Sequence, residues 1–150
     1  MNIRPLTYND INQCTQLYVK AYNERPWNYK WDHDKAAKYL YEYFERSRFV
    51  GFVLIEGGEI AGAMLGHSKT WWTGDLLYID ELFISPDRQE HGYGKLLLDH
   101  SEQYAKDKHY EVVILMTNKF MPAFKFYKKI NYLEAEQYVF FFKPLRNPPQ

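Results

Sequence analysis

Apolar residues recur along the chain at two spacings, and each change of spacing marks a new element. Residues 2–6 have the composition of a short strand. From Thr7 to about Asn23 apolar residues recur three and four apart, after a Thr-x-x-Asp start typical of a helix N-terminus. A second stretch with helical spacing follows Asp32 or Asp34, either of which can cap it. The first part of the chain therefore predicts one strand and two helices.

The middle of the chain has the composition of β-structure. Residues 49–56 are rich in β-branched and aromatic side chains, and Gly57-Gly58 is a strong signal for a tight hairpin. Residues 60–69 return as a second strand, and residues 76–84 form a third. This pattern predicts three consecutive strands.

The remaining part predicts two helices and three more strands. The unbroken apolar run at 112–116 is typical of a buried strand, and a helix separates it from the strand at 76–84, so the two should be parallel. Pro122 suits the first turn of the last helix, and residues 132–135 and 137–143 read as closing strands. The predicted order is β-α-α-β-β-β-α-β-α-β-β, an α/β fold whose mixed sheet carries helices on both faces.

Composition narrows the class of protein. The chain has 150 residues, and we assign residues 1–145 to one domain and 146–150 to a short C-terminal tail. Lys plus Arg and Asp plus Glu both number 19, and the zero net charge argues against a broad nucleic-acid-binding surface. The single cysteine, Cys14, reads as a buried apolar residue, and the histidines lack metal-binding spacing, so we expect no metal. No apolar run reaches the roughly 20 residues of a membrane span and no signal sequence opens the chain, so we expect a cytoplasmic protein.

One loop carries a candidate for phosphate binding. Gln89 to Gly94 reads Gln-x-x-Gly-x-Gly between a predicted strand and a predicted helix. Backbone N–H groups at a helix N-terminus can bind a pyrophosphate, and glycines let the chain approach it closely. An ordinary glycine-rich turn would have the same pattern. The loop lacks the Lys-Ser/Thr of a P-loop and the acidic residue of a dinucleotide-binding unit, which excludes those two sites.

Two stretches resemble the GNAT superfamily of N-acetyltransferases. The first is Glu81–Pro86 with the glycine loop and the three leucines that follow it. The second, Met121–Tyr132, is similar to the family element Ala-x-x-Phe-Tyr-x-Lys-x-Gly-Phe, with Asn131 at the glycine position and Tyr132 at the final Phe. The predicted element order also fits this family over nearly the whole chain.

The resemblance implies acetyl-coenzyme A (acetyl-CoA) as the acetyl donor. In the family the pyrophosphate binds the amides of the glycine loop, and the pantetheine arm pairs with a strand edge left open where the central parallel strands splay apart. An asparagine after the buried strand bonds the same arm in some members, although its usual spacing is not kept here. The resulting donor-site candidates are Leu82, Phe83, Ile84, Gln89, Glu90, His91, Gly92, Tyr93, Gly94, Lys95 and Asn118.

Three residues are candidates for proton transfer. The resemblance places Tyr127 beside the thioester sulfur, where a hydroxyl that titrates near 10 can protonate the leaving thiolate. Asp80 and Glu81 can each take a proton from the amine, directly or through water, or can simply attract it. Side chains alternate along a strand, so one of the two acids should face each side unless a bulge intervenes.

The sequence signal for the residues that bind the amine acceptor is less specific than the signal for the donor site. The segment E-R-P-W-N-Y-K-W joins the two predicted N-terminal helices, and Trp27, Asn28 and Trp31 are therefore candidates for the wall of a substrate pocket. Simple packing of these rings is an equal alternative. Trp71 and Trp72 could form an opposite wall.

We therefore expect an N-acetyltransferase that moves an acetyl group from acetyl-CoA to a primary amine, in a small molecule, by direct attack in a ternary complex. A protein or peptide acetyltransferase and a non-catalytic coenzyme A-binding module are the alternatives. We expect no membrane or nucleic-acid partner. The sequence allows a monomer or a homodimer, and the aromatic strand at 138–142 is either core or a dimer edge.

Overall fold

The computed structural model describes residues 1–146. Of the predicted tail 146–150, all but Arg146 lies outside the described residues. The elements follow in this order: β1 (Asn2–Pro5), the 3-10 helix η1 (Tyr8–Asp10), α1 (Ile11–Asn23), α2 (His33–Phe44), β2 (Phe49–Glu56), β3 (Glu59–Thr70), β4 (Asp75–Ile84), the 3-10 helix η2 (Pro86–Arg88), α3 (Tyr93–Asp107), β5 (Val112–Leu115) and α4 (Pro122–Lys129).

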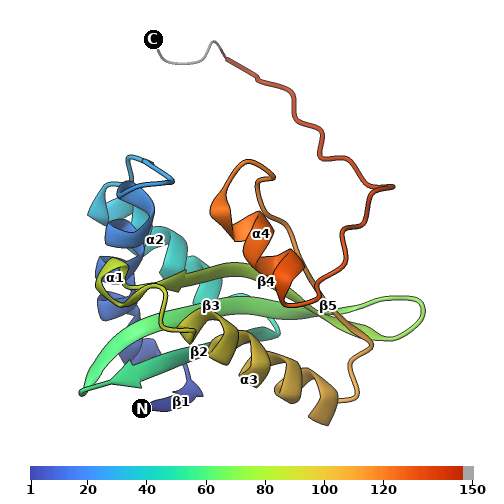
Figure 1. Ribbon diagram of the computed structural model, residues 1–150, viewed down its shortest axis with the longest axis horizontal. Coiled ribbons are helices and arrows are strands. Elements are labelled where there is room, and N and C mark those ends of the chain that lie inside the picture. Colours follow the sequence, from blue (N-terminus) through green and yellow to red (C-terminus); the bar gives the residue numbers. More distant parts are fainter. Residues whose placement is uncertain (147–150) are drawn as a thin grey trace.

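The strands form one sheet in the order in which they occur in the chain, from β1 to β5. β1 to β4 are antiparallel neighbours, and β5 pairs with β4 in parallel, as the intervening helix predicted. Gly57 and Gly58 close the predicted β2–β3 hairpin with φ values of +59° and +78°, a conformation that glycine adopts without a Cβ clash. Figure 1 shows α1 and α2 side by side, and the C-terminal segment running away from the body beyond α4. The predicted mixed α/β fold is confirmed.

Helices cover the sheet on two faces, which gives two clusters of buried side chains. α1 and α2 pack on one face around Ile11, Leu40, Val53, Leu65 and Phe83. α3 packs on the other around Phe52, Leu54, Met64, Leu77 and Leu97. Cys14 is buried in the first cluster, as predicted. In the described chain, no helix is long and apolar enough to cross a membrane.

Local polar contacts fix the start of both N-terminal helices. The backbone N–H of Thr7 donates to Asp10 Oδ2 at 2.8 Å, and Arg4 Nη1 reaches the same oxygen at 2.7 Å. Asp32 rather than Asp34 caps α2, because its side chain accepts from the backbone N–H of Lys35 at 2.8 Å. These contacts explain why η1, which leads directly into α1, begins after Thr7 and why α2 begins after Asp32.

A bulge interrupts β4 at Asp80. Leu65 pairs with Glu81 while the next residue, Gly66, pairs with Ile79, so Asp80 is extra in its strand. A Cβ at Gly66 would overlap the carbonyl oxygen of Tyr78, so glycine is needed opposite the bulge. Because of the bulge, the consecutive residues Asp80 and Glu81 need not point to opposite faces of the sheet, as neighbours in a regular strand do.

The two predicted closing strands, 132–135 and 137–143, are wrong for the described chain. Residues 133–146 run away from the body beyond α4 without strand pairing (Figure 1). Their composition favours β-structure, but a strand forms only where a second strand supplies hydrogen-bond partners. No strand of this chain lies next to them in the described residues.

Candidate active site

The bulge brings both strand carboxylates to the face covered by α2. Tyr39 donates to Glu81 Oε2 at 2.7 Å, and Tyr43, one helical turn later, donates to Asp80 Oδ2. Regular alternation, which would turn one acid to each side of the sheet, does not hold here, because the bulge that the sequence analysis allowed for is present and Asp80 is its extra residue. Sequence patterning has no signal for such an insertion.

Glu81 has the chemistry of a general base that works near neutral pH. Burial raises the pKa of its carboxyl to about 7, against the hydrogen bonds from Tyr39 and Tyr22, which lower it. The charge of Asp80 raises it slightly further. A carboxyl in this range is partly ionised at neutral pH and can take up a proton there.

Tyr127 lies on α4 within electrostatic reach of Glu81. Burial, and then the charge of Glu81, raise the pKa of the Tyr127 hydroxyl to about 12. The hydroxyl therefore keeps its proton at neutral pH and is available as a donor. α4 begins at Pro122, as predicted, so a base candidate and an acid candidate far apart in sequence share one site.

Asp80 is held by other groups. Arg46 Nη1 lies 3.7 Å and His67 Nδ1 3.5 Å from its Oδ2. Burial, and then Arg46, lower the pKa of His67, so this imidazole is mainly neutral at neutral pH. These contacts hold the exposed Asp80 carboxylate in place. Because Asp80 is already paired with Arg46 and His67, Glu81 is the better candidate for the base.

Aromatic rings from α1, α2 and the loop between them surround the Glu81 carboxyl. Trp31 stacks on Tyr39 with ring centroids 5.7 Å apart, and Asn23 fixes the Trp31 backbone with hydrogen bonds of 2.8 and 2.9 Å. Trp27 packs on Tyr22 at 5.5 Å. Both predicted tryptophans therefore contact rings that bond Glu81.

Three other acceptor candidates do not contact the rings around Glu81. Asn28 is exposed, and its amide reaches only the Pro26 carbonyl, at 3.4 Å. Trp71 and Trp72 stand exposed in the β3–β4 loop, at the opposite end of β4 from its open edge. Open space of about 340 Å³ instead adjoins Trp31, between Tyr29, Lys30 and Lys35.

Sequence reasoning missed two residues of the site, Tyr22 and Tyr39. Both lie on inward faces of helices, where a phenylalanine would fill the same space. The only available signal was the hydroxyl itself, because a buried Tyr OH usually has a hydrogen-bond partner. Neither helix reveals from its own sequence that the partner is Glu81.

The strand edge predicted for the donor is open. Pairing between β4 and β5 ends at Ile79 and Leu115, and within residues 1–146 Leu82 to Ile84 pair with β3 alone. Gln89 Nε2 lies 3.4 Å from the Ile84 carbonyl. The free backbone groups of this edge face the gap where the two parallel strands diverge.

The glycine loop ends at the N-terminus of α3. Gly92 is its N-cap, with φ +79°, and Glu90 also has a positive φ of +67°. The first-turn amides of Tyr93, Gly94 and Lys95 have no acceptor within the helix and lie at the surface end of the loop. This arrangement suits an anion.

The loop side chains have structural partners of their own. Tyr93 is buried and donates to Glu56, while Lys95 pairs with Asp99 at 2.8 Å. His91 is exposed and packs on the Tyr93 ring at 5.6 Å. The backbone, rather than these side chains, is therefore the part of the loop suited to a phosphate.

Asn118 closes the turn from β5 into α4. Its Oδ1 accepts from the backbone N–H of Phe120 at 2.8 Å, which occupies the side-chain oxygen. Its amide nitrogen is the group that could reach a ligand from the end of β5.

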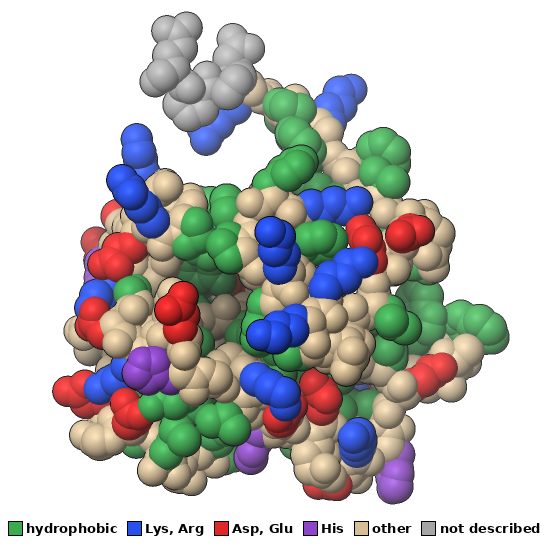
Figure 2. All heavy atoms as spheres, in the orientation of Figure 1, with side chains coloured by type: hydrophobic (Ala, Val, Ile, Leu, Met, Phe, Trp, Pro, Cys, Tyr) green, Lys and Arg blue, Asp and Glu red, His purple; other side chains and the backbone are tan. Residues whose placement is uncertain are grey.

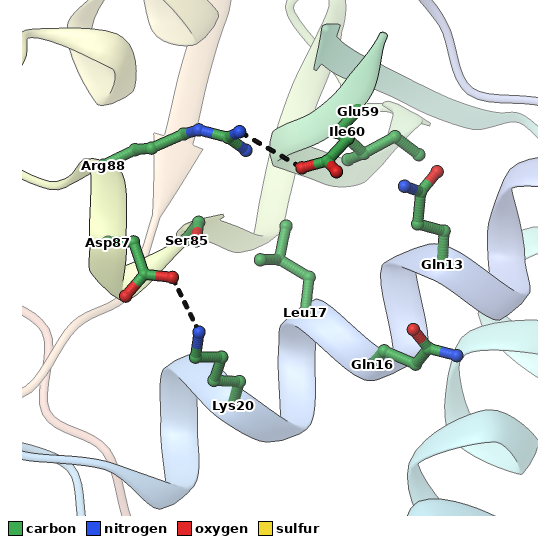
Figure 3. Close-up of a pocket in the computed structure, with 9 residues that line it drawn as sticks. All are labelled: Gln13, Gln16, Leu17, Lys20, Glu59, Ile60, Ser85, Asp87 and Arg88. Atoms are coloured by element: carbon green, nitrogen blue, oxygen red, sulfur yellow. Dashed lines mark hydrogen bonds and ion pairs between the residues drawn. The ribbon is translucent and has the colours of Figure 1, made fainter. Parts of the chain in front are cut away.

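A second hollow lies outside these groups. It has about 410 Å³ and is bordered by α1, η2 and the start of β3 (Figure 3). Two ion pairs span it, Lys20–Asp87 at 2.8 Å and Arg88–Glu59 at 3.2 Å. It contains none of the predicted site residues. Across residues 1–146, no cluster of three or more His, Cys, Asp or Glu side chains could hold a metal ion.

Comparison with known proteins assigns the family. Residues 11–132 match the model of the acetyltransferase (GNAT) family. An uncharacterized N-acetyltransferase of Methanocaldococcus jannaschii is 26% identical over 141 residues, which span 89% of this chain and 61% of that protein.

Solved structures share the fold. A possible acetyltransferase from Clostridium difficile 630 superposes with a TM-score of 0.83 at 15% identity, covering 97% of this chain and 98% of that one. An aminoglycoside acetyltransferase from an uncultured soil sample, in complex with sisomicin, gives 0.75 at 22% identity, covering 97% and 96%. With the family model matching most of its length, the chain belongs to the GNAT acetyltransferase family.

Proposed function

We propose that this protein transfers the acetyl group of acetyl-CoA to a primary amine of a small molecule, by direct attack in a ternary complex. The observation that supports the proposal is that the Tyr127 hydroxyl lies within electrostatic reach of the Glu81 carboxyl, next to the open edge of β4. Glu81 has a pKa of about 7 and Tyr127 one of about 12. One is suited to accept a proton at neutral pH and the other to donate one.

The open edge and the glycine loop are the proposed donor site. The backbone of Leu82 to Ile84 would hydrogen-bond the pantetheine arm as an added strand would. The first-turn amides of α3 would bind the pyrophosphate, helped by the positive end of the helix dipole. The side chains of these residues are mostly engaged elsewhere, so the donor site depends on backbone geometry.

Proton transfers at Glu81 and Tyr127 accompany the transfer of the acetyl group. Glu81 accepts a proton from the ammonium group, and the amine nitrogen attacks the thioester carbonyl carbon. A C–N bond forms, the attacking nitrogen loses its second proton to solvent water, and the C–S bond breaks. The thiolate takes the proton of Tyr127, whose hydroxyl is reprotonated from solvent. Holding the two reactants together supplies much of the rate enhancement.

The rings around Glu81 favour a small acceptor. Tyr39, Trp31 and Tyr22 lie around the Glu81 carboxylate, while Arg46 and His67 pair with the neighbouring Asp80. This environment suits one cationic amine on an apolar body. An acceptor with many amines and hydroxyls would need more acidic partners around it.

A thermal-shift titration with acetyl-CoA and with free coenzyme A tests the donor site. A ligand that binds only the folded state raises the melting temperature. Gly92→Ala should weaken binding by about 5- to 30-fold, because a non-glycine residue at positive φ costs about 1–2 kcal/mol. Gly57→Ala is the matched control, since Gly57 also has positive φ and open space but lies in the β2–β3 hairpin.

Thiol release with panels of amines tests the acceptor. Aromatic and aliphatic monoamines should turn over faster than aminoglycosides or lysine peptides. The absence of any melting shift near millimolar acetyl-CoA would overturn the donor site. Faster turnover of lysine peptides would instead support a protein acetyltransferase.

A further inference from the structure

The hollow beside Trp31 is separated from Glu81 by a single layer of aromatic rings. Tyr29 and Trp31 form two of its walls. Tyr29 stacks on Tyr22 with ring centroids 5.9 Å apart, and Trp31 stacks on Tyr39 at 5.7 Å. Tyr22 and Tyr39 both hydrogen-bond Glu81. Each aromatic wall of the hollow therefore rests on a ring that reaches the proposed base.

The remaining walls of the hollow are two lysines, Lys30 and Lys35. The surface that faces this space is almost entirely apolar, so the rings and the aliphatic stems of the lysines form it, and the ammonium groups lie at its margin. Its volume of about 340 Å³ falls in the range of small-molecule sites, about 300–1,000 Å³. The hollow thus suits the body of one small apolar molecule, with positive charge at the outer end.

The positive charge at this margin has no ion-pair partner in residues 1–146. The ion pairs of the described chain that contain a lysine include neither Lys30 nor Lys35. Asp32 lies between them in sequence, but its Oδ1 accepts the backbone N–H of Lys35, and Asp34 is exposed in the first turn of α2. α2 also begins here, so the positive end of its dipole adds to the lysine charges. Figure 2 shows Lys and Arg side chains, in blue, projecting from the corner of the molecule where the α1–α2 loop lies in Figure 1.

We propose that the amine acceptor carries an anionic group at the end away from its amine, and that Lys30 and Lys35 bind this group. The ammonium end would lie at Glu81, the apolar body would pass along the layer of rings, and the anion would lie at the outer margin of the hollow. The inference rests on the proposed function and names the substrate class within it, small zwitterionic amines, with a carboxylate as the simplest anion. A neutral amine would leave both lysines without a partner, and a polycation would be repelled by them.

The two charged ends would also orient the acceptor. Glu81 and the lysine pair have opposite charges and lie on opposite sides of the ring layer. A zwitterion therefore fits in one direction, with its amine at the carboxylate. Such an orientation holds the attacking nitrogen where acetyl transfer needs it.

Three amines that differ in one group test the charge. The probes are para-(aminoethyl)benzoate, its methyl ester and phenethylamine, and thiol release from acetyl-CoA gives kcat/KM for each. The parent protein should prefer the benzoate over both neutral amines by about tenfold, since exposed ion pairs contribute modestly and two would act together. The preference should lie mainly in KM and should fall at about 0.5 M salt, which screens exposed charges.

Substitution of the two lysines identifies the groups that recognise the anion. Lys30→Gln with Lys35→Gln should lower kcat/KM for the benzoate to the range of the neutral amines. Lys38→Gln is the matched control and should keep the preference, because Lys38 lies on the same helix, pairs with Glu42 at 3.8 Å and does not line the hollow. Equal turnover of the three amines by the parent protein, or a preference that survives both glutamines or high salt, would overturn the inference and leave the proposed acetyl transfer standing.

Binding measurements separate this inference from the proposed function. Calorimetric titration in the presence of free coenzyme A gives the affinity for each amine without any transfer. Tighter binding of the benzoate that is lost in the double glutamine variant, together with no thiol release from acetyl-CoA, would support the anion site and overturn the acetyl transfer. Equal affinity of the parent protein for the benzoate and its methyl ester would overturn the inference at any rate of transfer.

Discussion

Replacing Tyr39 by phenylalanine should move the acidic limb of the pH–rate profile to higher pH. The Tyr39 hydroxyl donates to Glu81 Oε2 at 2.7 Å, and this bond stabilises the charged carboxylate. Burial raises the pKa of Glu81 to about 7, and the Tyr39 bond keeps it from rising further. Without the hydroxyl, the pKa of Glu81 must increase while the ring still packs on Trp31.

The magnitude follows from the strength of that bond. A hydrogen bond to a charged group contributes about 1.5–3 kcal/mol, which is about one to two pKa units. Glu81 acts as a base only when ionised, so kcat/KM rises with pH until Glu81 has lost its proton. The midpoint should be near pH 7 in the parent protein and about one unit or more higher in Tyr39→Phe. Thiol release from pH 5.5 to 9.5 measures it.

Tyr43→Phe is the matched control, because Tyr43 makes the same kind of bond one helical turn later, to Asp80. It should leave the midpoint in place, and Glu81→Gln should remove the limb. The other groups acting on Glu81 are Tyr22 and Asp80, and burial raises the pKa of Tyr22, so it stays protonated throughout. An unchanged midpoint in Tyr39→Phe, or an equal shift in Tyr43→Phe, would refute Glu81 as the base.

Three further predictions concern the acid, the N-terminal ion pair and the bulge. Tyr127→Phe should lower kcat by about 10²-fold or more with little change in the KM for acetyl-CoA, and an unchanged kcat in steady-state thiol release would exclude it as the acid. Arg4 lowers the pKa of Asp10 to about 2, so the charged carboxylate stabilises the fold above about pH 4 and this contribution is lost as the pH falls toward 2. Asp10→Asn should therefore cost about 2 kcal/mol of unfolding free energy at pH 6 and much less at pH 2, as measured by urea denaturation. Gly66→Ala should destabilise the fold by about 1–3 kcal/mol in the same assay, because its Cβ would overlap the Tyr78 carbonyl, and a neutral result would contradict the tight approach at the bulge.

Local signals in the sequence predicted most of the fold. The Thr7 start, the Asp32 cap and the Gly57-Gly58 hairpin act through neighbouring residues, so α1, α2, β2 and β3 begin or end within a residue or two of their predicted bounds. The closing strands depended on a partner elsewhere in space. Composition predicts the tendency of a segment to form a strand but not the edge that receives it.

The site was predictable only in part. Resemblance to a family indicated Tyr127 and the open edge of β4, and the acid pair was visible as two carboxyls in an apolar strand. That both acids meet α2 follows from the register across Gly66, which no local pattern contains. The role of Tyr39 depends on the same register, since without the bulge its hydroxyl would not meet Glu81.

The agreement between strand order and chain order has a consequence for synthesis on the ribosome. Each strand from β2 to β5 pairs with the one made just before it, so none must wait for a later segment to emerge. Such a sheet can grow one strand at a time as the chain emerges. The exposed edge moves along with the nascent chain and comes to rest at β5. In the described residues, the two edges that remain are therefore β1, the first strand made, and β5, the last.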